Sequence, residues 1–298
     1  MYFPKHGDLH EFYDPSDRRM HLLELPELRG SRILYAKGSW LLLVRLKNFV
    51  IFFFCPYTRE MFTLTRLRPG HHVVAFSAPP TSPDCIVFAI YHLLASSIIV
   101  GTCRPGATKW DAFIYDNDQQ YMSRTWNQVI FSNARFYCMN VSGQVGVFNP
   151  ESNTWGLYYT PAPKYMLNLS FHYRWSAKFM AEHDGEIYVV CCSAAANPVI
   201  YRLDRVNKTW TEMMSLGRMA IFANARSSLS GTDLVGRMAG KMAGCVVFSK
   251  VLLHGRQCVM YSPRRGRYYP ANRFHNWNEE EPFDSVWIDA PDDASIFL

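Results

Sequence analysis

The stretch 129–159 constrains the fold of this chain most strongly, because it predicts four short strands in a row. Its apolar runs are separated by turn-forming residues at Asn133, Ser142-Gly143 and Asn149-Pro150. Short β-rich runs with such turns between them are typical of an antiparallel meander. Four strands cannot bury both faces of their sheet alone, so further copies of the unit should pack against this one.

The same pattern recurs along the chain. In each copy a turn, often containing Pro, precedes a Trp, Met or Tyr that opens the last strand of the unit. These positions are Met20, Met61, Trp110, Trp155, Trp210 and Tyr268, at intervals of 41, 49, 45, 55 and 58 residues. Units of roughly 40–50 residues with four strands each are the blades of β-propellers. The spacing therefore predicts six blades.

The assignment of strands also predicts how the ring closes. We expect one domain over residues 1–298, with blades near 1–28 plus 283–290, 30–66, 71–115, 127–161, 176–215 and 219–271. The first unit has only three strands, and the apolar strand Ser285–Ile288 is left over after the last unit. The fold prediction is an all-β, single six-bladed propeller with four-stranded antiparallel blades, closed by the C-terminal strand, which removes the open sheet edge.

The segment from Cys85 to Cys103 contains no charged residue and could be mistaken for a membrane span. Tyr91-His92 and Ser96-Ser97 interrupt it, and it is rich in Ile and Val. Strands that are buried on both faces form such continuous apolar runs. We interpret the segment as the second and third strands of the Trp110 blade, with a turn near 92–96, and expect no membrane insertion.

Composition narrows the classes of partner. The net charge of +6 is mild, and the longest basic run, Arg264-Arg265-Gly266-Arg267, lies in a predicted hairpin turn, which we interpret as a solvated loop. We expect no nucleic-acid binding. The eight cysteines form no C-x-x-C motif, so we expect buried free thiols, no metal site and no cofactor. The chain does not open on a secretory signal, and a cytoplasmic and/or nuclear location is expected.

Several segments resemble the plant F-box/kelch-like proteins: residues 25–30, 40–43, 53–60, 178–185 and 285–291. The resemblance covers essentially the whole chain. It implies a β-propeller that holds a protein substrate, behind a short helical F-box that binds the adaptor of a cullin-type ubiquitin ligase. This sequence departs from the pattern because it contains no recognisable F-box. Cys55 also replaces the usual Asn, and the segment 236–244 before the last blade is unusually rich in Gly and Met.

These features predict a non-catalytic, monomeric protein-interaction propeller that resembles the substrate-recognition part of a ubiquitin ligase but does not bind the ligase adaptor. One alternative is a glycosidase- or lactonase-like propeller enzyme, and another is a non-functional truncated paralogue. Against an enzyme, Glu182 and Asp184 lie at a predicted hairpin turn, and the adjacent His71-His72 would diverge on a strand. We see no nucleophile–base arrangement and therefore expect no catalysis.

The candidate contact residues lie in loops that connect the fourth strand of one blade to the first strand of the next. Such loops should emerge on one face of a propeller, and exposed Trp, Tyr and Arg are the residues that dominate protein–protein hot spots. The predicted protein-binding residues are Arg68, His71, Trp126, Tyr173, Arg174, Trp175, Arg218, His275 and Trp277.

Overall fold

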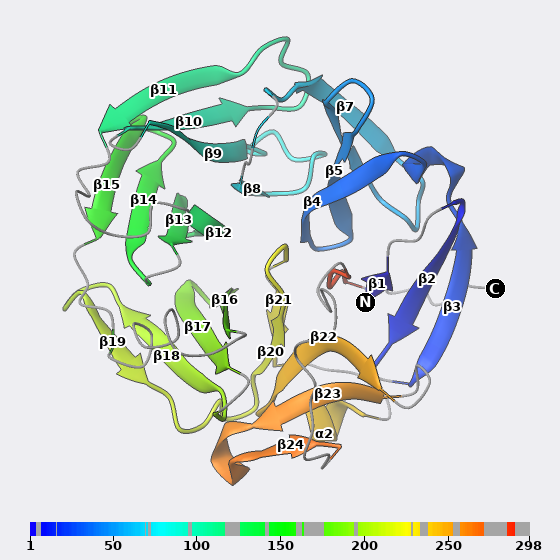
Figure 1. Ribbon diagram of the computed structural model, residues 1–298, viewed down its shortest axis with the longest axis vertical. Coiled ribbons are helices and arrows are strands. Elements are labelled where there is room, and N and C mark those ends of the chain that lie inside the picture. The colour runs from blue at the N-terminus through cyan, green and yellow to red at the C-terminus, as the bar shows by residue number, and fades with distance from the viewer. Residues whose placement is uncertain are drawn as a thin grey trace.

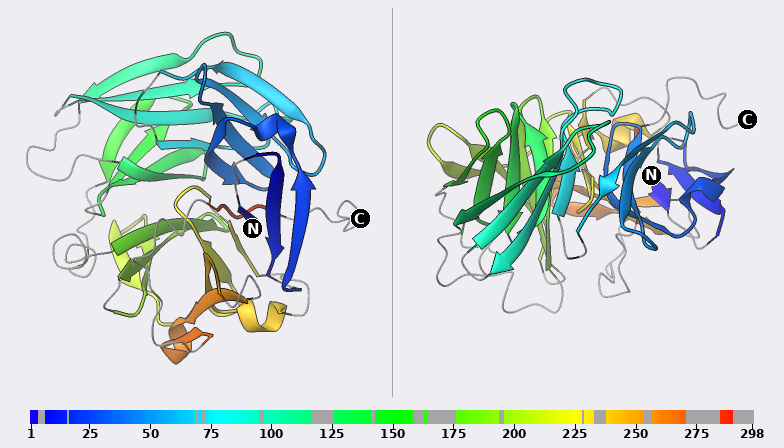
Figure 2. Two further views of the ribbon diagram at one scale, coloured as in Figure 1. Left: turned by 45° about the vertical axis from the view of Figure 1, so that its right-hand side comes forward. Right: turned by 90° about the horizontal axis from the view of Figure 1, so that it is seen from above.

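In the computed structural model, six β-sheets are arranged as a ring around a central axis (Figure 1). Seen from the side, the ring is a disc through which the strands run (Figure 2). The structure describes residues 1–298 except 4–6, 16, 69, 71–72, 95–96, 117–125, 141–142, 159–162, 164–175, 194–195, 228, 233–237, 253–256, 271–284 and 290–298. The predicted six-bladed propeller is confirmed.

The first three blades follow one another in chain order. Blade 1 contains β1 (Tyr2–Phe3), β2 (Leu9–Asp14) and β3 (Arg19–Glu24), and the short 3-10 helix η1 (Pro26–Leu28) follows it. Blade 2 contains β4 (Ser31–Lys37), β5 (Trp40–Arg45), β6 (Val50–Phe54) and β7 (Met61–Arg66). Blade 3 contains β8 (Val73–Phe76), β9 (Val87–Leu94), β10 (Ser97–Cys103) and β11 (Asp111–Asp116).

The remaining blades complete the ring. Blade 4 contains β12 (Trp126–Ser132), β13 (Arg135–Asn140), β14 (Val145–Asn149) and β15 (Thr154–Tyr158). Blade 5 contains β16 (Ser176–His183), β17 (Glu186–Ser193), β18 (Val199–Asp204) and β19 (Thr209–Glu212). Blade 6 contains β20 (Ala220–Ala223), β21 (Leu229–Gly231), the helical turn α2 (Ala239–Met242), β22 (Val246–Leu252), β23 (Gln257–Ser262), η2 (Pro263–Arg265) and β24 (Arg267–Tyr269).

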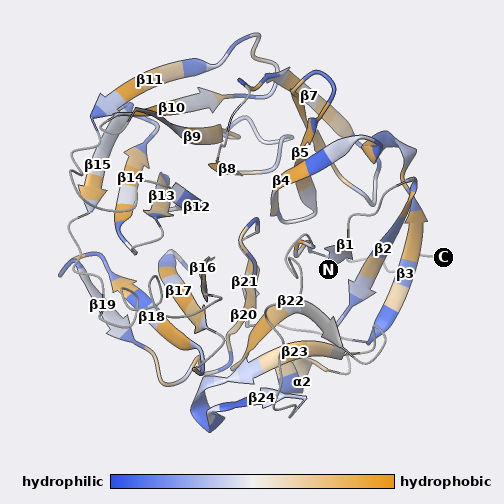
Figure 3. Cartoon of the chain, in the orientation of Figure 1, coloured by the Kyte–Doolittle hydropathy of each residue, from blue (hydrophilic) through white to orange (hydrophobic). Residues whose placement is uncertain are grey.

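Apolar residues concentrate on the inner and middle strands. In Figure 3, β17 and β22 carry the hydrophobic colour, whereas the outer strands β19 and β24 are paler or hydrophilic. The uncharged segment from Cys85 to Cys103 forms β9 and β10 of blade 3, as its composition predicted. Within the described ranges, no helix is long and apolar enough to span a membrane.

The two ends of the chain close the ring together. The Tyr2 N–H donates to the Val286 carbonyl (2.8 Å), and the Val286 N–H donates to the Tyr2 carbonyl (3.0 Å). This antiparallel bridge adds the segment Ser285–Ile288 to the inner edge of β1. Trp287 is buried and contacts the Phe222 ring of blade 6, with a distance of 4.9 Å between ring centroids. The predicted closure by the C-terminal strand is confirmed.

Removing residues 284–298 should expose the inner edge of β1 and separate blade 1 from blade 6. We expect oligomers in size-exclusion chromatography and a lower melting temperature, because an unpaired strand edge recruits other chains. The control is removal of residues 290–298 alone, which keeps the bridge between Tyr2 and Val286. A truncated protein that stays monomeric with an unchanged melting temperature would contradict the closure.

The repeated aromatic and Met positions occupy one register in the blades. Five of the six lie on the outer strand, directly opposite an apolar or aromatic residue of the third strand, and Trp110 lies one residue before β11. The pairs are Met20 with Tyr13, Met61 with Phe54, Trp155 with Phe148, Trp210 with Leu203, and Tyr268 with Tyr261. Trp155 packs on the core cluster that joins blades 2 to 4, and Trp210 on the cluster that joins blades 4 and 5. The repeat therefore marks packing between blades.

A glycine makes room for Trp155. A Cβ atom on Gly146 would lie 2.2 Å from Cη2 of Trp155 and 2.9 Å from Cη2 of Trp126, far inside contact distance. The two indoles meet edge to face, with 5.2 Å between ring centroids. Gly101 has the same role in blade 3, where a Cβ would lie 3.2 Å from the Trp110 ring.

Substitutions at this contact should be strongly coupled. We expect Trp155→Ala to lower the free energy of unfolding by about 2–4 kcal/mol, because it leaves a cavity where the half-buried indole packs. Gly146→Ala should cost about 1–3 kcal/mol in the wild-type protein through overpacking, and much less when Trp155 is already Ala. Urea unfolding of the two single variants and the double variant measures this, and strictly additive costs would contradict the packing described.

Blade 6 departs from the predicted four antiparallel strands. Its strand order is β21-β20-β22-β23-β24, and β20 pairs with β22 in parallel. Parallel neighbours need a long connection, which the chain supplies over residues 224–245. Tyr268 packs on the core cluster between blades 5 and 6, just as Trp210 packs between blades 4 and 5. Since β22 to β24 keep the arrangement of the other blades, β20 is the strand that runs in reverse.

Candidate functional site

The structure describes three of the nine predicted contact residues. Arg68 and Arg218 are exposed, whereas Trp126 is buried. The other six residues lie outside the described ranges and remain predictions: His71, Tyr173, Arg174, Trp175, His275 and Trp277.

The expectation that Trp126 is a surface residue is wrong. Trp126 is the first residue of β12 and is only 5% exposed. Its indole contacts Trp155 and belongs to the core cluster that joins blades 2 to 4. The sequence analysis placed it in a loop because the apolar run of β12 starts only at Val129. The pattern therefore did not show that the strand begins at Trp126 with this side chain facing the core.

Arg68 and Arg218 lie at opposite ends of the propeller, although the sequence suggested one shared face. Arg68 precedes β8, at the end where the first strands begin. Arg218 precedes the reversed strand β20, whose start lies beside the start of β22, and the Gly244 N–H donates to the Met219 carbonyl (3.1 Å). In an antiparallel blade the second strand starts where the first strand ends. The start of β22, and Arg218 beside it, therefore lie at the end opposite Arg68. We refer to the two as the Arg68 end and the Arg218 end.

At the Arg218 end, residues 224–227 and 229–231 cross the middle of the ring, where Figure 1 shows β21. The Ala36 N–H of blade 2 donates to the Arg226 carbonyl (2.7 Å), and the Trp287 N–H donates to the Ser227 hydroxyl (3.3 Å). The Ser230 hydroxyl donates to the Glu182 carbonyl of blade 5 (2.5 Å). The segment thus connects blade 6 to three other parts of the ring.

Other polar side chains near the axis also join neighbouring blades. Lys37 Nζ donates to the Ser77 carbonyl (2.9 Å) and lies 5.5 Å from the centroid of the Phe131 ring. Burial lowers the pKa of the Lys37 ammonium. Ser132 and Asn133 of blade 4 both donate to the Gly185 carbonyl of blade 5. These groups hold the inner strands together, and sequence analysis did not identify them because their partners are 40 or more residues away.

A serine, a histidine and an aspartate meet at this end, and sequence analysis missed the arrangement. Ser230 Oγ lies 3.2 Å from His183 Nδ1, and His183 Nε2 lies 3.5 Å from Asp184 Oδ2. A nucleophilic serine must donate its proton to the imidazole. Here the Ser230 proton is directed at the Glu182 carbonyl, and the Asp184 side chain is 89% exposed. The geometry fits a structural contact between blades 5 and 6.

The turn explanation for Glu182, near the end of β16, and Asp184, in the turn that follows, also holds. Glu182 Oε1 accepts a hydrogen bond from the Gly185 N–H (2.7 Å). Asp184 has a φ of 49°, the left-handed conformation that Asp tolerates in tight turns.

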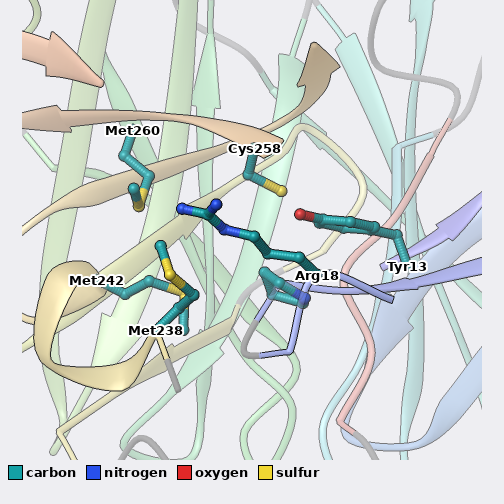
Figure 4. A pocket seen from close by; sticks show the side chains of 7 residues that line it. Tyr13, Arg18, Met238, Met242, Cys258 and Met260 are labelled. Atoms are coloured by element: carbon teal, nitrogen blue, oxygen red, sulfur yellow. The ribbon is translucent and has the colours of Figure 1, made fainter. Parts of the chain in front are cut away.

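A small cavity lies between blades 1 and 6 (Figure 4). Its volume of about 10 Å³ has room for about one water molecule. Arg18 points in among the side chains of Met238, Met242 and Met260, with Cys258 and Tyr13 on the other side of its stem. A soft metal ion would favour these sulfur ligands, but the guanidinium places a positive charge among them. The site does not fit a metal.

All eight cysteines are buried free thiols. Burial raises the pKa of the Cys85 thiol to about 11 and those of Cys191 and Cys258 to about 12. No cluster of three His, Cys, Asp or Glu side chains that could hold a metal occurs in the part of the chain that the structure covers.

The native protein should therefore resist thiol reagents. Because a thiolate is the reactive species and burial disfavours it, we expect almost no reaction with a disulfide reagent at mildly alkaline pH. After unfolding in denaturant, all eight thiols should react. Fast labelling of one or more thiols in the folded protein would show that its surroundings are open to solvent.

Comparison with known proteins gives a consistent picture. A family model described as KIB1-4 beta-propeller matches residues 12–265. The F-box/kelch-repeat protein At1g57790 of Arabidopsis thaliana is 31% identical over 99% of this chain and 82% of its own length. The F-box protein At3g56470 of the same plant is 30% identical over 98% of this chain and 76% of its own. The solved N-terminal domain of Nup159 is 12% identical over 87% of this chain and 71% of that chain, with a TM-score of 0.33. So weak a likeness supports no conclusion about function.

Proposed function

We propose a protein-interaction role for this chain, which belongs to the KIB1-4 beta-propeller family. The observation that carries the proposal is the similarity over nearly the whole chain to relatives named as F-box and F-box/kelch-repeat proteins. In F-box/kelch-like proteins the propeller is expected to hold the substrate of a ubiquitin ligase. The partner of this chain is then a protein substrate of that kind, and its role is recognition without catalysis.

The architecture suits such a role. Packing between blades and the closing strand make the ring a rigid support for the loops that connect them. Arg68 is an exposed arginine on one of these loops, and arginine is enriched among residues that dominate binding energy. The predicted residues Tyr173, Arg174 and Trp175 belong to another such loop in the sequence.

We further propose that residues 1–298 bind this partner without recruiting the ligase adaptor, because we recognise no adaptor-binding F-box among them. Residues 1–298 by themselves would then compete with F-box relatives for a shared substrate. We also propose that the protein acts as a monomer in the cytoplasm or nucleus.

Affinity capture from plant extract tests the proposal. The bait is the tagged 298-residue protein, compared with Arg68→Glu and with Arg135→Glu, an equal charge change at the Arg218 end. We expect one saturable protein partner whose recovery falls about tenfold with Arg68→Glu, because charge reversal in a contact opposes binding, and is unchanged with Arg135→Glu.

Three results would contradict parts of the proposal. Equal losses with the two variants would exclude the Arg68 end as the contact surface. Recovery of the adaptor with the 298-residue bait would contradict binding without recruitment. Turnover of a panel of glycosides and lactones by the purified protein would favour the propeller-enzyme alternative.

A further inference from the structure

The Arg218 end carries a basic surface that the proposed function does not use. It surrounds the start of β22 in blade 6, where three segments come together. We refer to it as the blade 6 basic surface, and its members are Arg218, Lys241, Arg264, Arg265 and Arg267, all of them exposed. In Figure 3 the turn between β23 and β24, which contains Arg264 and Arg265, shows the hydrophilic colour.

Contacts around Gly244 and Cys245 bring these cations together. The Met219 carbonyl, next to Arg218, accepts from the Gly244 N–H, and the Cys245 thiol lies 3.4 Å from the Lys241 carbonyl. The turn before Arg267 lies beside the start of β22, because Val246 pairs with Tyr261. The Cys245 thiol, whose pKa burial raises, is also within electrostatic reach of Arg265.

Two of the arginines converge on a single uncharged oxygen. Arg265 Nη1 donates to the Tyr269 hydroxyl oxygen (3.1 Å), and Arg267 Nε donates to the same atom (2.6 Å). The Arg267 guanidinium also lies over the Tyr269 ring, 5.0 Å from its centroid, which fixes its position. The hydrogen bond from Arg267, followed by that from Arg265, lowers the pKa of the Tyr269 hydroxyl.

Within the described ranges, this positive charge has no acidic side chain paired with it. Among the described residues, none of the five cations forms an ion pair. A guanidinium has five N–H donors, and the contacts to Tyr269 use one from each arginine. Arginine is the preferred residue where a carboxylate or phosphate is bound by paired donors. The two guanidiniums thus lie side by side, and most of their donors have no partner among the residues that the structure describes.

We propose that Arg265 and Arg267, supported by Arg218, Lys241 and Arg264, bind a phosphorylated segment of a partner protein. A phosphoryl group offers three acceptor oxygens and close to two negative charges, which matches two converging guanidiniums better than a single carboxylate does. Nucleic acid fits less well, because the surface is confined to one blade and has no continuous basic track. This site lies at the end opposite Arg68 and does not depend on the proposed function.

Direct peptide binding tests the inference. The probe is a fluorescein-labelled peptide pool with a fixed central phosphoserine between randomised positions, followed by fluorescence anisotropy with the 298-residue protein. We expect saturable binding that weakens as salt is added, since the contacts are exposed ion pairs. Arg265→Glu with Arg267→Glu should weaken it by at least about tenfold. Arg265→Lys with Arg267→Lys should lose part of the affinity, because lysine keeps the charge without the planar paired donors.

Matched controls separate this site from general charge effects. Arg32→Glu with Arg135→Glu makes the same charge change on exposed arginines of blades 2 and 4 and should leave binding unchanged. The pool with serine in place of phosphoserine should bind at least about tenfold more weakly. Equal binding of the two pools, or full binding by the Arg265→Glu, Arg267→Glu protein, would overturn the proposal. Inorganic phosphate that binds as tightly as the peptides would assign the site to the free anion and would overturn it too.

Discussion

The rest of the structure depends on the two backbone hydrogen bonds between Tyr2 and Val286. They join β1 to the closing segment Ser285–Ile288, which covers the inner edge of β1. A sheet edge presents a row of unpaired N–H and C=O groups, and closing the ring removes one such row. Trp287 is carried on the closing segment and is buried against Phe222, so the closure also seals apolar surface between blades 6 and 1.

Around the ring, the same packing device recurs with different residues. A large side chain at the start of the outer strand covers the interface with the preceding blade, as Trp155 and Trp210 show. In blade 4 the third strand has Gly146 beneath this ring, because any Cβ there would collide with Trp155 and Trp126. Each interface is therefore fitted locally, and the irregular intervals between repeats reflect loops of different length on one constant core.

Blade 6 shows how a departure from the repeat creates new surface. The reversed strand β20 moves Arg218 away from the end that carries Arg68 and places it beside Gly244. The connection that follows contributes residues 224–227 and 229–231 to the middle of the ring, and it contains the exposed Lys241. The paired guanidiniums of Arg265 and Arg267 therefore belong to a surface that also contains Arg218 and Lys241. The departure of blade 6 from the repeat therefore gathers basic residues at the Arg218 end.

The sequence by itself determined the all-β class, the six blades and the closing strand, because these follow from local patterns: alternating apolar residues, turn residues and the recurring Trp, Met or Tyr. It also identified Cys85–Cys103 correctly as two strands. Only the tertiary structure decided the direction of β20, the burial of Trp126 and the convergence of Arg265 and Arg267 on Tyr269. The direction of a strand depends on which distant strand supplies its hydrogen bonds. Whether the first side chain of a strand faces the core depends on the register of that pairing. Both are set by partners far away in the chain, which the local pattern of residues does not contain.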